Sequence, residues 1–168
     1  MGLLFAMPDG ITDDLEQTLA SIQAWAGKVD GFGKWTDVTF NAGNFVASVG
    51  AWTVSADDQR FFEYCVIGDR MDVHVLLSGT ATDGSVTGQL KLRLPGGYKV
   101  NAKEDGFVGH LLWHTAAAGT NVGLVYVNRN SADLSLYRDV AATAWPTSTS
   151  DLRIGFSVTL RVYQDLAV

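Results

Sequence analysis

A change in the period of the apolar residues divides the chain near residue 34. Beyond that point apolar side chains recur at every second position, as in Met71, Val73, Val75 and Leu77, with polar residues such as His74 between them. A period of two places the apolar residues on one face of an extended strand. Residues 34–168 are therefore predicted to form a β domain.

Turn residues separate these alternating segments at intervals of about 8 to 12 residues. Gly68-Asp69 supplies a two-residue hairpin loop, and Pro95-Gly96-Gly97 stops a later strand. The predicted strands cover residues 35–40, 45–50, 51–54, 61–67, 71–78, 86–94, 107–115, 122–128, 132–137 and 152–163. About nine or ten short strands with no helix between them predict an all-β fold, an antiparallel β-sandwich or jelly roll.

Residues 1–33 follow a helical pattern and are predicted to form a separate N-terminal segment with a short α-helix. Asp13 is placed to cap that helix, and Glu16 completes a variant of the capping box. Two heptads are too few for a coiled coil to be stable alone. The apolar residues of this helix form a narrow stripe at heptad spacing. One interpretation is that the stripe packs on its own β domain. The other is that it joins copies of the chain around an axis, or docks on a larger assembly. We expect the second, an oligomerisation or anchoring role for Leu15, Leu19, Ile22, Ala26 and Val29.

The charge balance narrows the set of partners. The 168 residues include 18 acidic and 12 basic side chains, a net charge of −6, and the basic ones form no cluster. Phosphate neutralisation needs a basic face, so neither nucleic acid nor an anionic membrane surface is an expected partner. No apolar run approaches the roughly 18 residues of a membrane span, and the first residues lack the basic start of a secretory signal. We expect a protein made in the cytoplasm.

The sequence contains no arrangement that points to catalysis. It lacks a Gly-x-Ser-x-Gly elbow and a glycine-rich phosphate loop leading into a helix. Cys65 is the only cysteine, which excludes a thiolate metal site, and we expect it to be buried and inert. His110 and His114 share one face of a predicted strand, but no third metal ligand suggests itself. We expect no enzyme activity, no cofactor and no metal site.

The tryptophans divide into core candidates and one surface candidate. Trp35, Trp52 and Trp113 lie in strand patterns and are expected in the core. Trp145 precedes Pro146 in a loop rich in Thr and Ser. A loop tryptophan can stack on a sugar or a partner protein, so Trp145 is the candidate for surface binding, although packing on its own sheet is the interpretation that we favour.

Four stretches resemble, in order and spacing, a pattern of phage tail and head-fibre proteins: residues 35–41, 62–73, 77–80 and 92–99. The pattern consists of a leading Trp, an aromatic-rich strand with an Ile-Gly hairpin, an apolar strand ending at Gly-Thr, and a Leu-Pro-x-Gly-Tyr turn. The turn, at residues 94–98, is its most specific element. These domains resemble jelly rolls of the C1q and tumour-necrosis-factor type, which usually assemble as trimers.

The resemblance implies a structural protein of a phage particle that acts by binding, as a homotrimer. The chain has only residues 1–33 ahead of the β domain, which favours a capsid decoration or head-fibre protein anchored by that segment over a tail fibre with a long shaft. A tail-fibre tip that binds a receptor is one alternative, and a lectin-like carbohydrate-binding module is another. The expected partners are further copies of the chain, other virion proteins such as the major capsid or tail proteins, and, for the alternatives, a host-surface glycan. The expected location is the virion.

Overall fold

The chain divides into two units in the computed structural model, Met1–Lys34 and Trp35–Val168. The structure describes residues 17–18, 33–83 and 88–164, and Gln17 and Thr18 are helical. No helix in these ranges has the length and apolar character needed to cross a membrane. The predicted stripe lies outside the described residues, so its role stays a prediction: Leu15, Leu19, Ile22, Ala26 and Val29.

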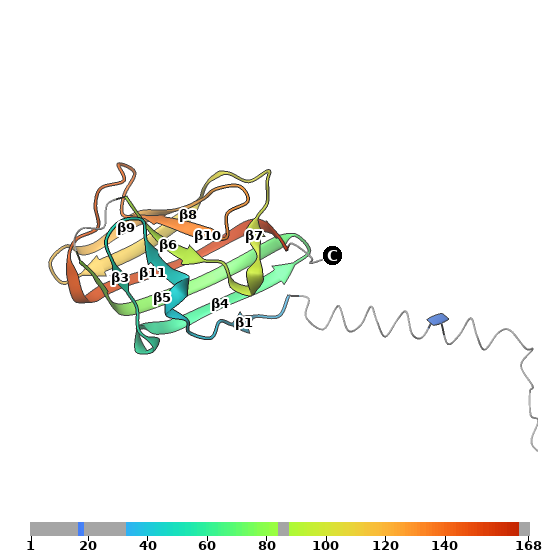
Figure 1. Ribbon diagram of the computed structural model, residues 1–168, viewed down its shortest axis with the longest axis horizontal. Helices are drawn as coiled ribbons and strands as arrows, with labels where there is room; N and C mark the ends of the chain where they lie inside the picture. The colour runs from blue at the N-terminus through green and yellow to red at the C-terminus, as the bar shows by residue number, and fades with distance from the viewer. Residues whose placement is uncertain (1–16, 19–32, 84–87, 165–168) are drawn as a thin grey trace, which may run out of the picture. The chain divides into compact units, whose positions relative to one another are not determined.

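The second unit is an antiparallel all-β domain, as predicted (Figure 1). Three short 3₁₀ turns, η1 (Ala42–Asn44), η2 (Ala56–Asp58) and η3 (Pro95–Gly97), interrupt its strands. The strands are β1 (Thr36–Asp37), β2 (Phe45–Ala47), β3 (Trp52–Thr53), β4 (Gln59–Ile67), β5 (Arg70–Thr82), β6 (Gln89–Arg93), β7 (Lys99–Val100), β8 (Gly106–Thr115), β9 (Gly119–Val127), β10 (Asp133–Tyr137) and β11 (Ser148–Tyr163).

The strands form one curled sheet in the order β1-β4-β5-β11-β8-β9-β10-β6-β2. The long strands β4, β5 and β11 run side by side (Figure 1). Two short strands lie off this path. β3, which follows the edge strand β2 in the chain, pairs with β5, and β7 pairs with β11. The two halves of the sheet thus face each other across a single core, in the manner of a sandwich or jelly roll.

Strict alternation builds the core from the two central strands. Met71, Val73, Val75 and Leu77 of β5 are buried, and every second residue of β11 from Leu152 to Val162 is buried opposite them. The predicted hairpin lies at Gly68, where a φ of +65° suits glycine. The expected burial of the Cys65 thiol is confirmed.

The corner after β6 is the local structure that residues 94–98 predicted. Pro95 begins η3, and Gly96 has a φ of +64°. The ring of Tyr98 packs over Gly96 and meets Tyr64 edge-on, with 6.5 Å between ring centroids. A glycine at position 96 therefore does two things: it adopts the left-handed conformation and leaves room for the tyrosine ring.

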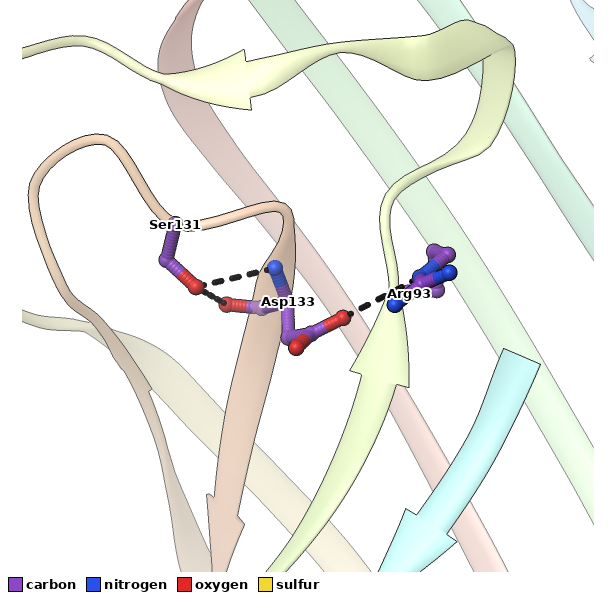
Figure 2. A network of polar contacts seen from close by, with 3 residues as sticks. All are labelled: Arg93, Ser131 and Asp133. Carbon is purple, nitrogen blue, oxygen red and sulfur yellow. Dashed lines mark hydrogen bonds and ion pairs between the residues drawn. The ribbon is translucent and has the colours of Figure 1, made fainter. Parts of the chain in front are cut away.

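The chain just before this corner is tied to the start of β10, as Figure 2 shows. Arg93 Nε lies 3.4 Å from Asp133 Oδ1, opposite it in the strand register. Ser131 Oγ donates to the carbonyl of Asp133 and accepts from its N–H at 3.0 Å. Because the Arg93–Asp133 pair is largely exposed, it aligns the two strands more than it stabilises them.

Substitution of the two corner glycines separates the effect of φ from that of packing. A Cβ on Gly97, with a φ of +73°, meets nothing within 4 Å, whereas a Cβ on Gly96 lies 3.0 Å from the Tyr98 ring. We expect Gly97→Ala to cost about 1 kcal/mol and Gly96→Ala roughly 2 kcal/mol. Urea unfolding at a fixed protein concentration measures both, and equal costs would show that the ring does not press on Gly96.

Candidate functional site

An apolar row crosses the outer face of the sheet formed by β4, β5, β11, β8 and β9. The strand register places Phe61 opposite Leu76, Leu76 opposite Gly155, Gly155 opposite Leu112, and Leu112 opposite Val122. These five residues, called here the apolar row, point away from the core because their sequence neighbours Phe62, Leu77 and Leu111 point into it. Five adjacent strands thus contribute one position each to a continuous line.

Three side chains of the apolar row are exposed although they are large and apolar. Leu112 is 57% exposed, Val122 56% and Phe61 42%. Phe107 is also exposed and meets His110 edge-on, with 4.9 Å between ring centroids. Contiguous exposed apolar patches on folded domains are typical of surfaces that contact another molecule.

A hollow of about 450 Å³ lies within this row. It forms where Gly155, which has no side chain, stands between Leu76 and Leu112. Phe61 and Leu112 stand at its margins as exposed apolar side chains. The face therefore has protruding apolar side chains next to an apolar hollow. This combination suits a packed apolar contact more than the binding of a polar solute.

All three histidines of the chain lie on this face. His74 on β5 stacks on Trp35, with 4.2 Å between ring centroids, and its Nδ1 lies 3.3 Å from Glu63 Oε1. His110 and His114 share the outer face of β8, as predicted from their spacing. Within the described residues no three His, Cys, Asp or Glu side chains converge on a point where a metal ion could sit.

Trp35 departs from the prediction that it lies in the core. It is 41% exposed and precedes β1, where its ring lies against His74 instead of the interior. The position is an edge of the sheet, where alternation alone does not distinguish the inner from the outer face. Trp52 and Trp113 are buried, as expected.

Trp145, the candidate for surface binding, lies in the core. It is 1% exposed and meets Trp113 edge-on, with 5.8 Å between ring centroids. Arg138 covers this pair: its guanidinium lies 5.1 Å from the centre of the Trp113 ring and donates to the Ala144 carbonyl. The candidate role in stacking on a sugar or partner is therefore wrong for Trp145, and the favoured interpretation, packing on its own sheet, is confirmed.

The apolar row was missed in the sequence although a signal for it exists. Apolar pairs interrupt the alternation at Phe61-Phe62, Leu76-Leu77 and Leu111-Leu112. In a strand one member of each pair must face outward, so such pairs indicate a sheet with apolar surface on both faces. Only the register shows that the three outward members line up.

Comparisons with known proteins add a remote similarity and no family. No family model and no curated protein matches the chain. A structure similar to this one is that of the receptor binding protein (gp15) of Listeria phage PSA, at 18% identity, with 94% of this chain and 82% of that chain covered and a TM-score of 0.46. At that TM-score no functional conclusion is drawn from the similarity.

Proposed function

We propose that the chain is a homotrimeric building block of a phage particle that acts by binding other proteins. The observation that carries the binding role is the apolar row with its hollow at Gly155, on the outer face of β4, β5, β11, β8 and β9. The phage assignment is supported by the ordered pattern at residues 35–99, whose most specific element forms the Gly96 corner. A trimeric jelly roll of the C1q type is the arrangement that this pattern favours.

The apolar row is proposed as the contact between copies. Leu112 projects beside a hollow that a leucine side chain of a second copy fits in size and chemistry. Burial of each exposed Leu, Val or Phe side chain contributes about 1.5–3 kcal/mol before the cost of association is subtracted. Because the surface holds both a projection and a recess, the projection of one copy can enter the recess of the next, which is the head-to-tail contact that closes a ring.

We place the trimer on the capsid, as a decoration or head-fibre protein with residues 1–33 as its anchor. A tail tip that binds a receptor is the second candidate. The lectin-like alternative took its support from Trp145, and that ring is covered by protein.

The genes beside the one that encodes this chain test the placement directly. Capsid and portal genes as neighbours would support a decoration protein, and baseplate or fibre genes would move the proposal to the tail. A neighbourhood with no virion genes on either side, in a genome without a prophage, would contradict the phage assignment.

A further inference from the structure

A second hollow, of about 360 Å³, lies two residues along β5, β8 and β11 from the apolar row. The register aligns Ser78 of β5 with Arg153 of β11, and Arg153 with His114 of β8. Arg60 reaches the same row from β4, at the irregularity between Gln59 and Phe61. Polar and cationic side chains therefore gather here beside the apolar row.

The side chains of Arg60 and Arg153 differ from those of the other described arginines in their polar contacts. Four other described arginines form ion pairs with aspartates: Arg70, Arg93, Arg129 and Arg161. Arg138 is engaged with Trp113 and the Ala144 carbonyl. Among the described residues, the side chains of Arg60 and Arg153 form neither an ion pair nor a hydrogen bond, in a chain with a net charge of −6.

The acidic groups at this hollow are already engaged by other donors. Asp151 lines this hollow and accepts two hydrogen bonds. The Ser148 hydroxyl donates to its Oδ1, and the Ala116 N–H donates to its Oδ2 at 2.7 Å. The Ser148 hydroxyl, with the Ala116 N–H next, holds the pKa of Asp151 below its usual value. Asp58 Oδ2 accepts from the backbone and hydroxyl of Ser55, and its Oδ1 faces Gly79. Neither carboxylate forms an ion pair with the two arginines.

We propose that this hollow binds an oxyanion, a phosphate or carboxylate group carried by a ligand. β4 and β11 flank β5, so the backbones that carry Arg60 and Arg153 are about 10 Å apart. Two long arginine side chains can close on one anion across that span, each offering a planar fork of donors that matches phosphate or carboxylate oxygens. The Ser78 hydroxyl lies between them, and His114 adds a further ring nitrogen at the margin. The inference does not rest on the trimer, because both arginines belong to one chain.

Calorimetric titration of the full chain at constant ionic strength tests the site. Inorganic phosphate and glucuronate are the two probes, and glucose is the neutral comparison. We expect at least one of the two anions to bind with a dissociation constant in the millimolar range, and glucose not to bind. Whether phosphate or glucuronate binds shows whether the site recognises a phosphate or a carboxylate group. Arg60→Gln and Arg153→Gln should each weaken that binding by about tenfold.

Arg129→Gln is the matched control, because Arg129 is also an exposed arginine and is paired with Asp105 outside the hollow. It should leave anion binding unchanged. The proposal is overturned if neither anion binds up to roughly 10 mM, or if Arg129→Gln weakens binding as much as the other two variants, which would indicate general attraction by charge. A change in oligomeric mass on Arg153→Gln with unchanged anion binding would also overturn it and assign the arginines to a contact between copies.

Discussion

Leu112→Asp is expected to dissociate the proposed trimer into monomers at micromolar concentration while leaving each β domain folded. Leu112 is the most exposed member of the apolar row and stands at the margin of the hollow, so it has no part in the core. The substitution removes an apolar contact worth about 1.5–3 kcal/mol and adds a carboxylate whose burial costs several kcal/mol more. Because each copy carries the change, the penalty recurs at every interface.

Val46→Asp is the control for this experiment. Val46 is 48% exposed on the edge strand β2, so it accepts the same chemical change at a similar exposure away from the apolar row. Sedimentation equilibrium gives the mass of each variant, and circular dichroism confirms that both are folded. If Leu112→Asp keeps the oligomeric mass of the unmodified chain, the apolar row is not the contact.

Among glycine-to-alanine substitutions in the β domain, Gly123→Ala is expected to be the most destabilising. A Cβ on Gly123 would lie 2.3 Å from the Tyr137 carbonyl oxygen, 2.8 Å from Leu111 Cδ1 and 3.0 Å from the Arg138 carbonyl oxygen. Two of these three atoms belong to backbone and cannot rotate away, so β9 must move relative to β10. We expect the free energy of unfolding to fall by about 3 kcal/mol, at the upper end of the usual cost of overpacking.

Gly43→Ala serves as the matched change, since its Cβ meets only the side chain of Asn41, at 3.2 Å, and that side chain can shift. It should cost less than about 1 kcal/mol. Chemical unfolding at the same protein concentration compares the two. Similar small losses in both variants would mean that β9 and β10 are not as close at Gly123 as described.

The fold of the β domain could be predicted because each of its strands carries local information. The apolar residues of β5 alternate so strictly with polar ones that the segment can only be a strand with one buried face: Met71, Val73, Val75 and Leu77. The glycine turn at Gly68 determines where this strand begins. The corner at Gly96 was likewise readable, since proline and two glycines leave the backbone few conformations. These features depend on neighbours in sequence, which is what a pattern records.

The apolar row could not be predicted because it depends on which strands are neighbours. Gly155 lies opposite Leu112 only because β11 pairs with β8, and no local pattern specifies that pairing. Trp145 remained a candidate for surface binding for a related reason: its own segment is polar, and its ring packs against Trp113 beside Arg138, two residues outside that segment. Alternation predicts which face of a strand is apolar, but tertiary contacts decide what covers a loop.

The mass of the unmodified full chain in solution tests the proposed assembly most directly. Light scattering coupled to size exclusion at micromolar concentration should give three times the 18.1 kDa of one chain. A mass of 18.1 kDa across that concentration range would contradict both the trimer and the proposed role of the apolar row.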